Sequence, residues 1–361
     1  MNLLRQKLRL RYGYHLAKFL LKELKSKVGI PLSKRVQLLR EGFFSISYYY
    51  YDLGRNSATD YLTDYQRYVR APLINKEFSF FLNNKMAFHV LLNPFPQYQV
   101  ELVGAIEGGR ILNADLVPVP DQWFWDQLRQ RGRLVAKPVR GAAGSGVMIL
   151  RSEACGIRLG RERGFPEEVL GRVKQLEDGI ITEFVAQHPL VASFFPETTN
   201  TVRVLMLRDM DNGRPFVAAA ILRVGSERSY PVDNWEKGGL SVPIDLGTGQ
   251  LGTAVKLDPG GQELQRFAPH PESGVRIEGV HLPFWSQVRD GLLEVCRTIP
   301  VLRYVGWDVI VTDHGFKILE GNSYSGVSSI QVHGPLLTNH AVRRFYDAHM
   351  KLLKPATPPR A

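Results

Sequence analysis

One lysine and three glycines in residues 133–150 form the first group that could do chemistry. An apolar run delivers Lys137 on an expected strand, and Gly141, Gly144 and Gly146 fill the loop before a second apolar run. Backbone amides of such a loop can close over phosphate oxygens, and the neighbouring lysine can neutralise them. The segment is neither a Walker loop nor a dinucleotide fingerprint, because the residues after the glycines do not fit either motif. An ordinary surface hairpin explains it equally well.

Two acids in residues 305–323 form the second group. Counting outward from a three-residue hairpin loop at positions 313–315 gives these expected cross-strand pairs: Thr312 with Phe316, Ile310 with Ile318, and Asp308 with Glu320. Like charges that face each other destabilise a sheet unless something compensates, and a divalent cation with oxygen ligands does so. Asn322 follows on the same face and supplies a third oxygen. The alternative is a solvated hairpin end, which the two isoleucines on that face argue against.

The elements that must position these groups change in character near residue 78. Before it the chain is basic and helical in pattern, and after it strands and short helices alternate with glycine and proline. We expect helices at 84–92 and 121–129, a strand with a glycine turn at 100–112, and hairpins at 133–150 and 305–323. The fold class is therefore α+β.

Composition limits the class of protein. A chain of 361 residues with 44% hydrophobic and 22% charged residues can bury a large core and form more than one domain. Cys155 and Cys296 lie far apart in the sequence and form no CxxC pair, which indicates neither a zinc site nor a disulfide framework. With neither a secretory signal nor a membrane span in the sequence pattern, we expect a cytoplasmic protein.

The charge of +11 is concentrated at one end of the chain. Residues 1–40 contain eleven Lys or Arg and one acid, Glu23, so the remainder is nearly neutral and nucleic acid is an unlikely partner. Apolar residues recur in this segment at helical spacings: Leu3, Leu4, Leu8, Leu10, Leu16, Phe19, Leu20 and Leu24. We expect a helix that packs its leucines on the core and solvates its lysines. The alternative is attraction to an anionic substrate or to the inner face of a membrane.

An aromatic run at residues 42–54 follows the basic segment. Its density favours core or interface packing over stacking on a sugar or a base.

The order of the motifs resembles the ATP-grasp superfamily, and most closely its sugar-transfer-associated family. The resemblance covers roughly residues 85–325 and rests on six motifs in order: NK at 84–85, VAKPVRGAAGSGV, ITEFVAQHP, NTVRVLML, DNWEKGGL, and GWDVIV with ILEGN. It implies an ATP-grasp fold of two α+β lobes that grip ATP, preceded by a basic, mainly helical region at 1–80. The catalytic region is then 81–350, with a lid lobe at about 130–185, and 351–361 is a flexible tail.

The resemblance also implies the residues that bind nucleotide and metal. The nucleotide-binding positions are Lys85, Lys137, the lid loop Gly144, Ser145 and Gly146, and the adenine hinge Glu183, Phe184 and Val185. Gln187 or His188 stands where the family has a ribose-binding acid. Asp308, Glu320 and Asn322 match the Mg²⁺ ligands. For Lys85, a surface lysine at the start of a helix is an equally good explanation.

Catalytic and substrate positions follow from two further motifs. Arg203 resembles the arginine near the transferred phosphate and acts with Lys137, where a fixed fork suits phosphate or carboxylate oxygens; the alternative is an edge-strand arginine in solvent. The substrate-side positions implied are Asn200, Asn234, Lys237, Gly238 and Gly239.

The activity implied is that of an ATP- and Mg²⁺-dependent ligase that releases ADP and phosphate. A small-molecule or saccharide carboxylate attacks the γ-phosphate of ATP, and an amine or other nucleophile then attacks the acyl phosphate. The family's name suggests a cell-surface saccharide or its precursor as substrate. The alternatives are a phosphotransferase on the same scaffold and a non-catalytic protein that binds membrane or nucleic acid. The opposed Asp308 and Glu320 argue against the last.

Overall fold

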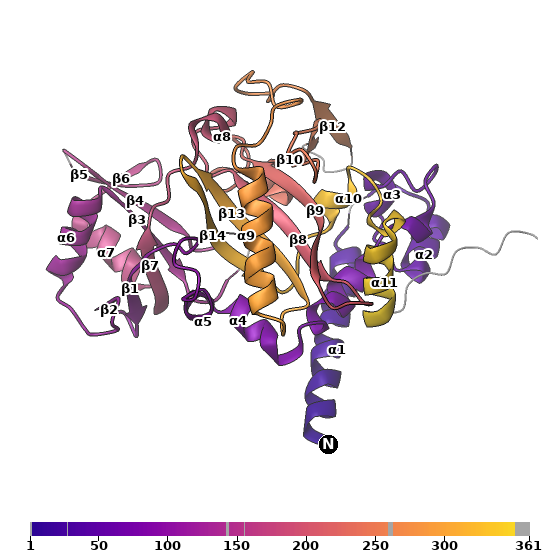
Figure 1. Cartoon of the computed structure of the whole chain (residues 1–361), viewed down its shortest axis with the longest axis horizontal. Helices are drawn as coiled ribbons and strands as arrows, with labels where there is room; N and C mark the ends of the chain where they lie inside the picture. Colours follow the sequence, from indigo (N-terminus) through magenta and orange to yellow (C-terminus); the bar gives the residue numbers. More distant parts are fainter. Residues whose placement is uncertain (1, 27, 142–143, 155, 259–262, 351–361) are drawn as a thin grey trace, which may run out of the picture.

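Two antiparallel sheets organise the chain (Figure 1). The computed structural model describes residues 2–26, 28–141, 144–154, 156–258 and 263–350, and only the backbone of residues 2–9 and 11. Within these residues the first sheet has the order β2-β1-β7-β3-β4-β5-β6, with β1 Leu102–Glu107, β2 Arg110–Asn113, β3 Arg133–Pro138, β4 Met148–Glu153, β5 Gly156–Leu159, β6 Glu162–Gly164 and β7 Asp178–Glu183. The second has the order β12-β11-β10-β9-β8-β13-β14, with β8 Thr201–Arg208, β9 Pro215–Val224, β10 Leu240–Pro243, β11 Ala254–Leu257, β12 Leu264–Phe267, β13 Tyr304–Thr312 and β14 Gly315–Asn322.

Helices cover the faces of both sheets. Their bounds are α1 Asn2–Leu24, α2 Leu32–Glu41, α3 Ser47–Tyr50, α4 Ser79–Asn83, α5 Lys85–Leu91, α6 Asp121–Arg131, α7 Pro166–Lys174, α8 Pro189–Phe194, α9 Trp285–Thr298, α10 Ser328–Gln331 and α11 His340–His349. Apolar residues of α6 and α7 bury one face of the first sheet. Those of α9 bury one face of the second sheet, and α10, α11 and residues 62–74 pack on its other face.

The two sheets are joined beside the β13–β14 hairpin. On the way into β1, Tyr98 accepts a hydrogen bond from the backbone of Ile318 (2.7 Å). On the way out of β7, the backbone N–H of His188 donates to Val311 (2.7 Å). Both connections between the lobes are therefore fixed to one edge of the second sheet, next to the acids of the hairpin.

The expected α+β fold is confirmed, as are most of the expected elements. Helices α5 and α6, the β1–β2 turn and the β3–β4 hairpin occur where the sequence pattern predicts them. The first sheet is wider than the expected lid lobe, because β1 and β2 precede residue 130. The expected tail at 351–361 and Cys155 lie outside the described residues.

The register of the β13–β14 hairpin corrects the expected one. Its turn contains two residues, 313 and 314, so the pairs Thr312 with Phe316 and Ile310 with Ile318 are wrong. Instead Thr312 pairs with Gly315, Val311 with Phe316 and Val309 with Ile318. A β-bulge after Asp308 then leaves Leu319 unpaired and restores the expected pair of Asp308 with Glu320. Ile318 lies in the core under α9, on the face opposite Glu320.

The N-terminal region is helical, as predicted, but most of its described leucines do not pack on the core. Phe19 is buried and Leu16 packs beside it, whereas Leu10, Leu20 and Leu24 are exposed. The expectation that the leucines are buried is therefore wrong for these three, and the side chains of Leu3, Leu4 and Leu8 lie outside the described residues.

The aromatic run at 42–54 packs in the core, as expected. Phe43 and Tyr51 are buried in one cluster with Trp235, and Phe44 stacks on Phe19 at 4.7 Å between ring centroids. In the described part of the chain, no helix combines the length and the apolar character that a membrane span requires.

Candidate functional site

A network of four charged residues, three of them buried and one half-buried, lies on the face of the second sheet opposite α9. Arg203 on β8 stands directly opposite Asp308 on β13, and its Nη2 donates to Oδ2 of Asp308 (2.8 Å). Arg223 on β9 reaches the same oxygen (3.3 Å) and donates to Asp233 (2.8 Å). Asp233 also accepts from the backbone N–H of Thr201 (2.9 Å). Asp308 is therefore held by two arginines, one of which a second carboxylate orients.

The carboxylate of Glu320 faces Asp308 without an arginine partner of its own. Burial, and then the charge of Asp308, raise the pKa of Glu320. Burial alone would raise the pKa of Asp308 as well, but Arg203 and Arg223 outweigh it and lower the pKa. The two carboxylates therefore differ: the arginines favour the charged form of Asp308, whereas burial and Asp308 disfavour the charged form of Glu320, which a bound cation would favour.

These residues fit a magnesium ion by the chemistry of their donors. Two carboxylates and the amide of Asn322 are oxygen ligands of the kind that Mg²⁺ prefers. The Nδ2 of Asn322 donates to Gly306 O (3.1 Å), which leaves its amide oxygen for a ligand. Among the described residues no group of three or more His, Cys, Asp or Glu side chains could hold a metal, so Asn322 is needed to complete a set of three.

Two lysines lie near Glu320: Lys137 on the first sheet, and Lys85 on α5, which packs against the second sheet beside β14. The charge of Glu320 raises the pKa of both Lys137 on β3 and Lys85 at the start of α5. Burial opposes this effect and is larger, so the pKa of Lys137 falls to about 8. The side chain of Asn84 caps α5 by accepting from Ala87 N (2.9 Å), and Lys85 N donates to Val139 O (3.0 Å). The start of the helix is thereby fixed beside the strand that carries Lys137.

The glycine loop contacts the second lobe. Gly144 has a φ of +71°, and a Cβ there would lie 2.5 Å from Val232, so only glycine fits this approach. Ser145 and Gly146 are exposed beside it. Nearby, the guanidinium of Arg161 donates to Glu227 (2.8 and 2.9 Å), pairs with Glu197, and lies 4.0 Å from the ring centroid of Tyr230. The lid loop and the β5–β6 turn therefore both touch the other lobe.

The segment expected to read adenine connects β7 to α8 between the lobes. Glu183 and Glu101 are tied through their backbones (3.1 Å), and the Glu183 side chain accepts from Glu101 N (3.0 Å). Phe184 lies under the guanidinium of Arg133 (5.0 Å). Val185 is partly buried in the same connection.

Gln187 and His188 differ in how they are held. Gln187 donates to Thr198 O (2.7 Å) and accepts from Asn200 N (2.9 Å), so its side chain is already engaged. His188 accepts from Leu190 N (3.1 Å) through Nδ1, and the described part of the chain offers its side chain no second hydrogen bond. Of the two, His188 is the better candidate for a ribose contact.

The substrate-side positions divide into structural and accessible residues. Asn200 is fully buried, and its amide donates to Val191 O (2.8 Å) and accepts from Gly225 N (3.0 Å), so it holds the backbone here. Asn234 accepts from Glu236 N (2.9 Å), which starts the turn. A Cβ at Gly239 would lie 2.8 Å from Asp233 O, so this glycine is needed for packing. Lys237 is exposed on the same turn, beside the buried Gly238.

Arg223 and Asp233 are site residues that sequence reasoning missed. Asp233 stands at the start of the DNWEKGGL motif, which was the available signal. Arg223 becomes a site residue only because β9 pairs with β8 and places it opposite Thr201. That pairing between distant strands leaves no mark in the local pattern.

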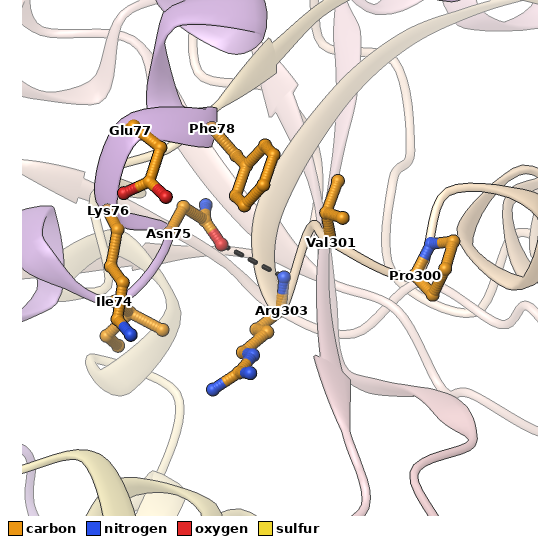
Figure 2. A pocket seen from close by; sticks show the side chains of 8 residues that line it. All are labelled: Ile74, Asn75, Lys76, Glu77, Phe78, Pro300, Val301 and Arg303. Carbon is orange, nitrogen blue, oxygen red and sulfur yellow. Dashed lines mark hydrogen bonds between the residues drawn. The ribbon is translucent and has the colours of Figure 1, made fainter.

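A surface pocket of about 250 Å³ lies away from this site (Figure 2). It is lined by Ile74, Asn75, Lys76, Glu77, Phe78, Pro300, Val301 and Arg303. Asn75 is buried and accepts from the backbone of Arg303 (2.9 Å), which fixes the start of β13. The pocket therefore belongs to the far end of the strand that carries Asp308.

Comparison with known proteins places the site in a family context. The sequence model of the family described as sugar-transfer associated ATP-grasp matches residues 122–344, more than half of the chain. No curated protein is significantly similar in sequence.

Solved structures similar to the chain include the ATP-grasp ligase PsnB with a minimal precursor, at 15% identity and a TM-score of 0.38 over 76% of this chain and 62% of that chain. D-alanine–D-alanine ligase from Bacillus anthracis matches at 12% and 0.39 over 74% and 68%. The ADP complex of PurK, an N5-carboxyaminoimidazole ribonucleotide synthetase, matches at 10% and 0.43 over 75% and 52%. The chain thus covers less than two thirds of the PsnB chain.

Proposed function

The chain belongs to the sugar-transfer-associated ATP-grasp family, and from this premise we propose that it is an ATP- and Mg²⁺-dependent ligase that joins a carboxylate to an amine or another nucleophile. The observation that carries the proposal is the buried carboxylate pair Asp308–Glu320 with two lysines beside it, Lys137 from the first lobe and Lys85 from α5. Anionic ligands bound through a divalent cation match both halves of this arrangement.

The proposed reaction has two steps. An oxygen of the substrate carboxylate attacks the γ-phosphorus of ATP, the bond to the bridging oxygen breaks, and ADP leaves. The amine then attacks the acyl carbon, and phosphate departs with the former carboxylate oxygen while the amine loses a proton. Bound at Asp308, Glu320 and Asn322, Mg²⁺ would neutralise phosphate charge.

The residues of the chain contribute positioning and charge. Lys137 and Lys85 hold phosphate oxygens, and the glycine loop excludes water above them. Arg203, now paired with Asp308, offers a fixed fork to the transferred phosphate or the substrate carboxylate. Glu183, Phe184 and Val185 receive adenine, His188 the ribose, and the turn with Lys237, Gly238 and Gly239 faces the acceptor.

We propose a saccharide carboxylate, of the cell surface or its precursor, as the substrate class. A screen of uronic-acid oligosaccharides with candidate amines tests this by ADP and phosphate release and by product mass. Hydroxylamine in place of the amine should give a hydroxamate, because it captures an acyl phosphate. ADP release with phosphate retained on the product would replace the ligase by a phosphotransferase. For variants of Lys137, Lys174→Met serves as the control, because Lys174 pairs with Asp121 on α6 (2.7 Å).

A further inference from the structure

Helix α1 presents an apolar stripe that nothing in the described part of the chain covers. Leu10, Tyr14, Leu21 and Leu24 are 72%, 63%, 56% and 77% exposed, and the exposed Ala17 lies between them. Their spacings of four, three, four and three residues put them on one helix face. In Figure 1 α1 projects away from both sheets.

The opposite face of the same helix is committed to the protein. Phe19 is buried against Phe44, and the Tyr12 hydroxyl is hydrogen-bonded to that of Tyr65 (2.5 Å). Glu23 is 3% exposed and accepts from Ser45 N (3.0 Å). The helix is therefore fixed on the body, and its exposed stripe faces away from it.

The exposed charges that residues 1–40 themselves place beside the stripe have one sign. Glu23 is the single acid of residues 1–40, and it is buried beside Arg35 (3.1 Å). Lys18 and Lys25 are exposed next to the stripe, and the sequence places further basic residues toward the N-terminus. Among the described side chains of residues 10–40, therefore, no carboxylate is exposed.

We propose that α1 docks the protein on an anionic lipid surface, with the stripe at the boundary between headgroups and acyl chains and the lysines on the phosphates. An exposed apolar face flanked by Lys and Arg binds such an interface through both contributions. A second copy of the chain fits worse, because two such helices would face each other with like charges. Nucleic acid would use the charges but leaves the leucines unexplained.

Co-sedimentation of the full chain with vesicles tests the proposal. Vesicles of phosphatidylcholine with about one third phosphatidylglycerol should bind it at least about tenfold more strongly than phosphatidylcholine alone, and salt should weaken binding. Leu21→Ser with Leu24→Ser should lower the partition coefficient about tenfold or more, since both residues are exposed and the fold is spared. Phe165→Ser removes a similarly exposed apolar residue, 74%, from the lid lobe and should change nothing.

Three results would overturn the proposal, each with protein shown by its melting temperature to be folded. The first is equal partition of wild type into neutral and anionic vesicles, and the second is unchanged partition of the double variant. The third is a dimer that does not bind vesicles and that the double variant dissociates, which would assign the stripe to a second copy.

Lys18→Glu with Lys25→Glu should reduce binding to anionic vesicles and leave binding to neutral vesicles unchanged.

Discussion

Charge balance at the hairpin depends on a single side chain. Asp308 and Asp233 form ion pairs with Arg203 and Arg223, whereas Glu320 has no arginine partner among the described residues. Its raised pKa follows from burial and from the neighbouring Asp308. A bound cation would favour the charged form of Glu320 and so oppose the rise in its pKa.

We therefore predict that ATP binds tightly only with a divalent cation. Chelation should weaken ATP binding at least about tenfold by calorimetry, about 1.4 kcal/mol. Glu320→Gln should abolish most of the metal dependence. The control is Glu294→Gln, at a residue that accepts a hydrogen bond from Tyr98, and it should leave the metal dependence unchanged. Equal affinity for ATP with and without chelator would contradict the metal site.

Lys137→Met is predicted to keep the fold and lower turnover. The variant removes a positive charge that would stabilise the phosphates most strongly during transfer, and loss of one such preorganised donor costs roughly a hundredfold in rate. Lys137→Arg should rescue only in part, since the guanidinium is longer and planar. ADP production by Lys137→Met within about twofold of wild type would return Lys137 to ordinary hairpin structure.

The pKa of Lys137 predicts a pH dependence of nucleotide binding. Because burial lowers this pKa to about 8, the lysine is charged below that pH and loses its proton above it. The dissociation constant of Mg-ATP should therefore rise as pH increases from about 8, by up to about tenfold per unit. Lys137→Arg should be flat over the same window in a calorimetric titration, and an identical rise in that variant would exclude Lys137 as the origin.

At the scale of elements, the facing pair of acids in the β13–β14 hairpin could be predicted, although the register of the strands between the turn and this pair could not. The turn has two residues, one fewer than expected, which shifts the register by one residue. The bulge at Leu319 shifts it back, so Asp308 still pairs with Glu320. Alternation of apolar residues places each strand but does not record a bulge. The pairing of Asp308 with Arg203 needs β13 beside β8, which the sequence pattern did not show.

The β5–β6 turn predicts a role for Arg161 in keeping the lobes together. Its ion pairs with Glu197 and Glu227 join the lobes but are nearly half exposed, so solvent weakens each of them. Arg161→Ala should raise the KM for ATP by about two- to tenfold with little change in stability. The matched control is Arg158→Ala, whose partner Glu153 lies in the same lobe (2.7 Å). An unchanged KM would show that these ion pairs do not favour closure.

At the scale of the whole molecule, the sequence pattern predicted a sharper boundary between the N-terminal region and residues 81–350 than the structure has. The charge of the N-terminal region is isolated in sequence, but its packing is shared with the body. Leu38 is buried in one cluster with Trp235, and Lys22 lies 4.0 Å from Glu236. Trp235 and Glu236 both belong to the turn at residues 234–239. Arg67 donates to Ser328 (2.7 Å), just beyond the β13–β14 hairpin. Contacts between residues this distant in sequence follow from the assembled fold alone.

Deletion of residues 1–40 is therefore predicted to destabilise the protein without removing its nucleotide site. Phe19 and Leu38 are buried, and loss of a core phenylalanine alone typically costs about 3–5 kcal/mol, so calorimetry should show a clearly lower melting temperature. The residues proposed to bind the nucleotide come from β3, α5 and β14, so Mg-ATP should raise the melting temperature of truncated and full-length protein by a similar amount. Leu21→Ser with Leu24→Ser should melt like wild type, since both side chains are exposed. A folded truncation that Mg-ATP no longer stabilises would make the N-terminal region part of the nucleotide site, and an unchanged melting temperature would make it an independent appendage.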